Sequence, residues 1–244
     1  MHNRRLIRWI AVGALVFAGL AAAVDVVALQ VTESRAASQL VQGMAAERAT
    51  VDLGSFPFLP NLLRGRLELA DVSVTGASGG GLRVANVRAR VSDPRFSGSD
   101  VISLLRNRYS TRTEVRGDDP VGVAQITQDD LETHVRANMA SVHSLVITSG
   151  QIVVYFSDDE GERLDEPARF VPDVRDRRIA LRILGRASIP PAFRDDAERL
   201  QDLIDLPLLP EGLRTNVTVG NGVFAIEVSG PDVVLRLGEG SVEE

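Results

Sequence analysis

Cysteine and histidine, two residue types that often act as nucleophiles, general bases or metal ligands, are scarce in this sequence. The 244-residue chain has no cysteine and three histidines, so disulfides, thiolate metal sites and cysteine nucleophiles are excluded. Neither His134 nor His143 is part of a set of Asp, Glu and His residues at metal-ligand spacing. The acidic run at residues 158–162 lacks the alternating spacing of a calcium loop. We interpret both histidines as structural or surface residues and the acidic run as a solvated turn, and we predict no metal site.

The sequence also predicts no catalytic centre. No stretch is predicted to form either the strand-to-helix elbow that presents a nucleophilic serine or a glycine-rich loop that cradles phosphates. No nucleophile or general base can be nominated within a cleft. We therefore expect a protein that is not an enzyme and has no cofactor.

Composition and charge indicate one globular domain that does not bind nucleic acid. The chain is 44% hydrophobic and 25% charged, which is sufficient for one sizeable core. All 27 basic residues are arginine, a bias typical of a high-GC genome. Arg4, Arg5 and Arg8 lie before the first acidic residue. Residues 25–244 therefore contain 24 arginines and 33 acidic residues, a net charge of −9. A domain this acidic is poorly suited to phosphate backbones.

An uncharged apolar stretch, residues 9–24, follows these three arginines. It is either a signal peptide with a cleavage site at Ala21-x-Ala23, or an anchor slightly shorter than the ~20 residues that span a bilayer, with Trp9 and Asp25 at the two interfaces. Helix-compatible sequence continues to about residue 47, which favours the uncleaved anchor; a buried core helix is the third alternative. Because arginines stay cytoplasmic, the signal peptide and the anchor both place the domain outside the cytoplasm.

Periodicity in the remaining sequence predicts an α+β fold. Alternation predicts strands at residues 49–53, 67–74, 82–91, 121–126 and 177–188, and helical spacing predicts helices at 26–44, 101–105, 128–139 and 192–204. Thr127 should cap the helix at 128–139. We expect a long curved antiparallel sheet packed with a few helices and preceded by an N-terminal hydrophobic helix. Residues 1–29 would form the signal peptide or anchor, 30–238 the domain and 239–244 an acidic tail.

Two turn-forming dipeptides predict the register of two hairpins. A loop at Asn221-Gly222 pairs Val219 with Phe224, Val217 with Ile226 and Thr215 with Val228. A loop at Ser149-Gly150 pairs Ile147 with Ile152, Leu145 with Val154 and His143 with Phe156. Both registers gather apolar side chains on one face.

Four short motifs, in order along the chain, carry a resemblance to a known family. Residues 56–65 follow the pattern Phe-Pro-Phe-Leu-x-x-x-Leu-x-Gly, and Val72-x-Val74 comes next. Ile126-Thr127-x-x-Asp130-Leu131 opens a helix, and Leu206-Pro207-x-x-Pro210-x-Gly212-Leu213 leads to a hairpin. These motifs resemble the signature of the actinobacterial LmeA-like phospholipid-binding family, and the resemblance extends over nearly the whole chain.

The resemblance implies a phospholipid-binding envelope protein with an elongated fold similar to tubular lipid-binding domains. Such a site needs apolar walls for acyl chains and donors for the phosphate, for which arginine is well suited. The candidates are Phe56, Phe58, Leu59, Leu63, Arg64, Arg66, Leu206, Leu208 and Leu209. The alternative is that the two phenylalanines and the loop at 206–210 only fill the core.

We therefore expect a non-catalytic protein that holds or shuttles phospholipid in an apolar groove or tunnel. Its location would be extracytoplasmic, in the envelope of an actinobacterium-like cell, anchored to or exported across the cytoplasmic membrane. Bound phospholipid and the membrane are the expected partners. The alternative function is a structural or adaptor domain that docks other envelope proteins without binding lipid.

Overall fold

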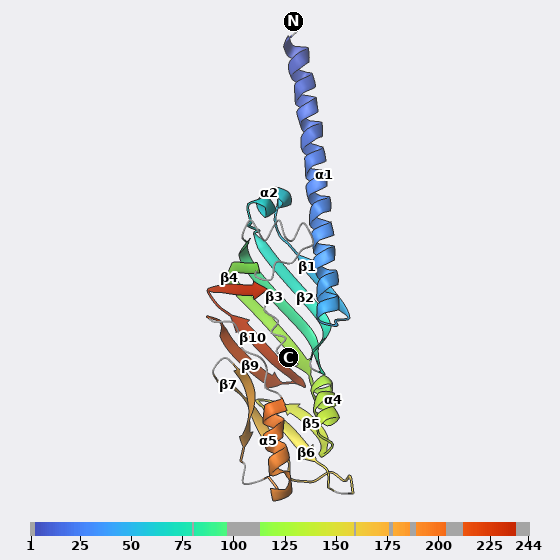
Figure 1. The fold of residues 1–244 in the computed structure, drawn as a ribbon, viewed down its shortest axis with the longest axis vertical. Coiled ribbons are helices and arrows are strands. Elements are labelled where there is room, and N and C mark those ends of the chain that lie inside the picture. The colour runs from blue at the N-terminus through green and yellow to red at the C-terminus, as the bar shows by residue number, and fades with distance from the viewer. Residues whose placement is uncertain are drawn as a thin grey trace.

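One long helix leads into two antiparallel sheets (Figure 1). The computed structural model describes residues 3–79, 81–96, 113–158, 160–175, 178–185, 189–203 and 212–237. The helices are α1 (Asn3–Gly43), α2 (Phe58–Leu63), α4 (Gln128–Asn138), the 3-10 helix η2 (Pro191–Phe193) and α5 (Arg194–Leu203). The strands are β1 (Arg48–Asp52), β2 (Leu69–Gly79), β3 (Leu82–Phe96), β4 (Thr113–Thr127), β5 (Val142–Thr148), β6 (Gln151–Phe156), β7 (Ala168–Arg175), β8 (Arg178–Leu184), β9 (Arg214–Gly220), β10 (Val223–Ser229) and β11 (Asp232–Leu237).

The predicted α+β class is confirmed, and its main element is a seven-stranded antiparallel sheet. The strands follow the order β1-β2-β3-β4-β10-β9, and β11 pairs with the part of β4 that precedes its pairing with β10. The register predicted for the Asn221-Gly222 hairpin is confirmed, with Val219 opposite Phe224 and Val217 opposite Ile226. Both loop residues have positive φ values, 52° and 73°, as a type I′ turn requires.

A second sheet, β5-β6-β7-β8, lies with α5 at the end of the molecule opposite α2 (Figure 1). Ile147 and Leu145 pair with Ile152 and Val154 as predicted. The predicted pairing of His143 with Phe156 is wrong, because an irregularity between Val142 and Ser144 places Val142 opposite Phe156. Strand β7 was not predicted from the sequence.

The largest core cluster joins the two sheets. It contains fully buried side chains from α4, α5, the second sheet and the β9–β10 hairpin, among them Leu131, Phe170, Leu200 and Phe224. The predicted cap of α4 is confirmed, since Thr127 Oγ1 accepts a hydrogen bond from the Asp130 amide at 3.2 Å. The predicted helix at 101–105 and the acidic tail at 239–244 lie outside the described residues.

Helix α1 runs unbroken through Asp25 and continues along the edge of the seven-stranded sheet (Figure 1). Its 41 residues correspond to a length of about 60 Å. Leu40 and Met44 pack on a cluster formed by Ala46, Val74 and Ala77, whereas the N-terminal half extends past the sheet. Where the structure describes the side chains of its helices, no helical stretch is both long and apolar enough to cross a membrane.

Asp25 fixes α1 to α2. Its carboxylate is buried at 5% exposure and accepts hydrogen bonds from the Phe58 and Leu59 amides, both at 2.6 Å. These amides belong to the first turn of α2, where helical N–H groups have no partner within the helix, and the N-cap residue Pro57 supplies no side-chain cap. Asp25 therefore caps a helix that lies 33 residues further along the chain.

Asp25→Ala should loosen this junction. The substitution leaves two amides without an acceptor, and a hydrogen bond to a charged group contributes about 2 kcal/mol. We expect the Phe58 and Leu59 amides to exchange with deuterium at least roughly tenfold faster, measured by mass spectrometry on the full chain in mild detergent. Gln30→Ala, an exposed position on the same helix, is the matched control. Equal exchange in the two variants would contradict the capping role.

Candidate lipid-binding site

The predicted site residues on α2 divide between the interior and the surface. Phe58 has no exposed surface and forms a small core cluster with Leu62 and Leu67. Leu59 is half-buried against this cluster, as are Ala28 and Leu29 of α1. Phe58 therefore fills the core at this end of the domain, which was the alternative interpretation of this residue.

Phe56, two residues before α2, and Leu63, the last residue of α2, are both exposed. Phe56 is 68% exposed and Leu63 is 69% exposed, and neither belongs to a core cluster of the described residues. Large apolar side chains are usually withdrawn from water. These two residues are available to contact an apolar ligand or surface.

The two predicted phosphate donors, Arg64 and Arg66, line one surface cavity of about 430 Å³ with Asn61, Leu67, Glu68 and Asp93. Arg66 is already paired, because both its Nε and its Nη2 donate to the Asp93 carboxylate. A hydrogen bond from Arg66, which has the larger effect, and one from Arg95 hold the pKa of Asp93 below its ordinary value. The side chain of Arg64 has no ion-pair partner among the described residues, so its guanidinium group is the free donor of this cavity.

Sequence analysis did not include the face of the seven-stranded sheet among the candidates. The strand register places Ala49, Val74, Val87, Ala124, Ile226 and Val217 in one row across six strands. The next row on the same face contains Val51, Val72, Ala89, Gly122, Val228 and Thr215. Side chains directly opposite one another in antiparallel strands share a face, so this face is apolar in all but one of these twelve positions.

The opposite face of the same sheet is polar. Between the two apolar rows lie Thr50, Ser73, Arg88, Val123, Glu227 and Asn216, whose side chains point to the other side because alternate residues of a strand do so. The alternation in strand 82–91 was visible in the sequence. The alignment of apolar positions from six strands depends on the strand order and register, which the alternation within single strands does not predict.

The apolar face is only partly covered. Val74 and Ile226 are buried, but Ala49, Val87, Ala124 and Val217 in the same row are half-buried. Every residue of the second row is also half-buried. Leu40 of α1 and Met44, which follows the helix, cover the part of the face near β1 and β2. Ala124, Val217 and Val228 pack against the largest core cluster. Part of the remaining apolar surface is thus open to a ligand.

The other predicted candidates do not add to this site. Leu206, Leu208 and Leu209 lie outside the described residues. A larger cavity, of about 590 Å³, is lined by Asp165, Glu166, Pro167, Arg169, Ile189, Pro190, Pro191 and Arg194 near η2. We give it less weight for lipid, because half of its lining residues are charged and it contains neither Arg64 nor the apolar sheet face.

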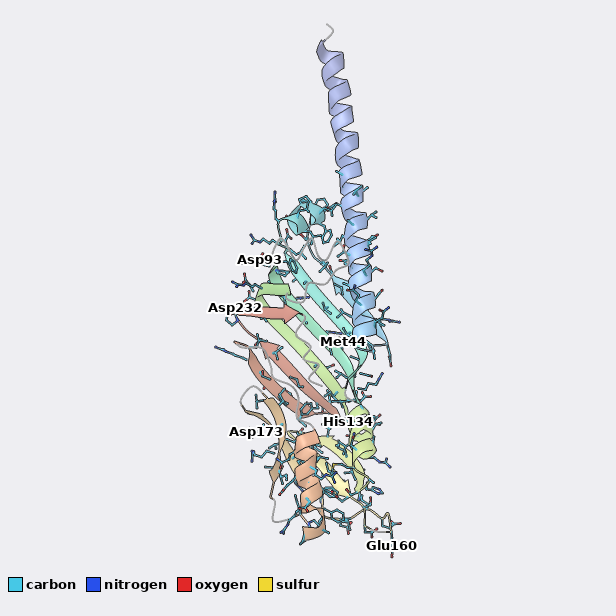
Figure 2. The ribbon with its side chains drawn as sticks, viewed as in Figure 1. Met44, Asp93, His134, Glu160, Asp173 and Asp232 are labelled. Carbon is cyan, nitrogen blue, oxygen red and sulfur yellow. The ribbon has the colours of Figure 1, made fainter. Side chains whose placement is uncertain are left out.

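The residues considered for catalysis and metal binding occupy separate positions. His134 is buried in α4 (Figure 2), and its Nδ1 has no hydrogen-bond partner, whereas His143 is exposed. Residues 76–80 have the letters of the G-x-S-x-G motif, but Ser78 lies at the end of β2 next to a β-hairpin instead of a strand-to-helix elbow. In the described part of the chain, no group of three or more His, Asp or Glu could hold a metal ion.

Comparison with known proteins agrees with the resemblance noted in the sequence. The family model described as LmeA-like phospholipid-binding matches residues 23–229, which include Asp25, α2 and the apolar sheet face. No curated protein and no solved structure gives a significant match. Because the match covers most of the sequence, the chain belongs to the LmeA-like phospholipid-binding family.

Proposed function

We propose that the protein holds or carries a phospholipid in the bacterial envelope, with acyl chains against the apolar face of the seven-stranded sheet and the phosphate at Arg64. The observation that carries this proposal is the half-buried pair of apolar rows. Family membership supports phospholipid binding, and the rows supply an apolar wall that the chain's own side chains leave partly open. The protein would bind its ligand without transforming it.

The dimensions of the apolar face suit an acyl chain. Neighbouring strands are about 4.8 Å apart, so a row that crosses six strands extends over about 24 Å. One leaflet of a bilayer contributes about 15 Å, half of the ~30 Å hydrocarbon core. A single extended acyl chain therefore fits along one row.

The N-terminal segment supports a location outside the cytoplasm. Three arginines precede the uncharged residues 9–24, an arrangement that keeps the start of the chain cytoplasmic and sends the following domain across the membrane. The segment would act either as an anchor or as a signal peptide cleaved after Ala23. Cleavage at that position leaves Asp25, and thus the cap of α2, on the mature chain.

Ala89→Phe should block the acyl chains. Ala89 is half-buried in the centre of the second apolar row, and a phenyl ring there would occupy space that we assign to lipid. We expect a severalfold loss of phospholipid, measured by organic extraction and mass spectrometry of the purified chain that begins at Val24. Val121→Phe is the control, because Val121 is 50% exposed on the opposite face of β4.

Both variants must keep the circular dichroism spectrum and melting temperature of the parent for this comparison. Unchanged lipid content in Ala89→Phe would contradict the assignment of the acyl chains to this face. Absence of lipid from the parent protein, together with no uptake of labelled phospholipid, would instead support the structural or adaptor function.

Arg64→Gln should weaken phospholipid uptake without changing the fold. The substitution removes a charged donor, and such hydrogen bonds contribute about 1.5–3 kcal/mol, so we expect a roughly tenfold or greater rise in the apparent Kd for labelled phospholipid. Arg199→Gln, at an exposed position on α5, should leave the Kd unchanged. Equal Kd values for Arg64→Gln and the parent would show that the phosphate lies elsewhere.

A further inference from the structure

Helix α2 lies at the level where α1 leaves the domain (Figure 1). The hydrogen bonds that the Phe58 and Leu59 amides donate to Asp25 hold α2 beside this part of α1. The uncharged stretch, residues 9–24, ends immediately before Asp25 and extends about 24 Å further along the helix. A bilayer that contained this stretch would have its surface close to α2.

The surface at this level carries unusual apolar side chains. Among the residues whose side-chain burial the structure describes, which exclude, among others, residues 3–20 and 235–237, Phe56 and Leu63 are the only exposed phenylalanine and leucine, and the other large exposed apolar side chains are valines. Two of these valines, Val24 and Val27, lie on α1 beside the Asp25 junction and are 59% and 58% exposed. We call these four residues the apolar tip.

Two acidic side chains near the apolar tip are satisfied within the protein, and a third, Glu68, is exposed in the Arg64 cavity. The Asp25 carboxylate is buried and accepts two amide hydrogen bonds, so it does not face outward. Asp93 is paired with both Arg66 and Arg95. Arg64, which follows Leu63, has no ion-pair partner among the residues described, and cations of this kind favour the phosphate level of a membrane.

We propose that the apolar tip docks on the surface of a phospholipid bilayer, with Phe56 and Leu63 inserted at the level of the headgroups and upper acyl chains. This docking goes beyond lipid binding and rests on the proposed membrane attachment. It is continuous with the uncharged stretch of α1, which is why the occupant is a bilayer and not a protein surface. Docking places the Arg64 cavity against the membrane, so a phospholipid can pass between the bilayer and the protein with its phosphate near one arginine.

The depth of single spin labels tests this docking. The chain has no cysteine, so Leu63→Cys gives one attachment site in the full chain, reconstituted in vesicles of phosphatidylcholine and phosphatidylglycerol. We expect the label at position 63 to be severalfold more accessible to oxygen than to a water-soluble nickel reagent. Glu160→Cys, at the opposite end of the molecule (Figure 2), should show the reverse. Adding Phe56→Ser should move the label at position 63 toward water.

Each outcome decides the proposal. A label at position 63 that is as accessible to nickel as the one at position 160 overturns it, and protection that appears only in native membranes assigns the tip to a protein partner. A label at Ala14→Cys reports separately whether α1 enters the bilayer. If the label at position 14 is in lipid and the label at position 63 is in water, docking is refuted but the anchor is not. If the label at position 14 is in water, the proposed anchor is refuted. Phospholipid content, measured on the same samples, tests the proposed binding function independently.

Discussion

A buried carboxylate must find hydrogen-bond donors, because an unsatisfied buried charge is strongly unfavourable. In this protein the donors are two amides of α2, at 2.6 Å from Asp25. This one interaction satisfies the charge, caps a short helix and fixes the direction in which α1 leaves the domain. The position of α2 in turn determines three placements: Phe58 in the core, Phe56 and Leu63 on the surface, and Arg64 in its cavity.

The second constraint is the one-sided chemistry of the long sheet. Aligned apolar rows on one face and aligned polar residues on the other mean that only one side requires protection from water. Leu40 of α1 and Met44, just after the helix, protect the region near β1 and β2, and the largest core cluster packs on Ala124, Val217 and Val228. Among the described residues, Val51 and Ala89 of the second row are half-buried and belong to none of the core clusters. In the proposed function, the acyl chains would lie on this face and the phosphate at Arg64, near the α2 end of the same sheet.

The sequence predicted those elements whose signals are local. The Asn221-Gly222 turn determined the register of β9 and β10, and Thr127 marked the start of α4. Strand β7 was not predicted, because Pro172 interrupts its alternation of apolar and polar residues. The proline is tolerated because β6 pairs with β7 only at residues 168–170, which leaves position 172 bonded to β8 alone. The role of Asp25 and the alignment of the apolar rows depend on contacts between distant segments, which residue spacing does not encode. The family motif at residues 56–65 includes α2, which was not among the predicted helices, and the motif did not separate the buried Phe58 from the exposed Phe56.

The central claim is that acyl chains lie on the apolar face of the seven-stranded sheet. A phospholipid with a photoreactive diazirine in its acyl chain tests this most directly, since irradiation attaches the chain to the residues that it contacts. The account predicts modified peptides from β3, β4 and β10 that include Val87, Ala89, Ala124 or Ile226. Modification confined to α2, or none in protein that still binds the lipid, would contradict it.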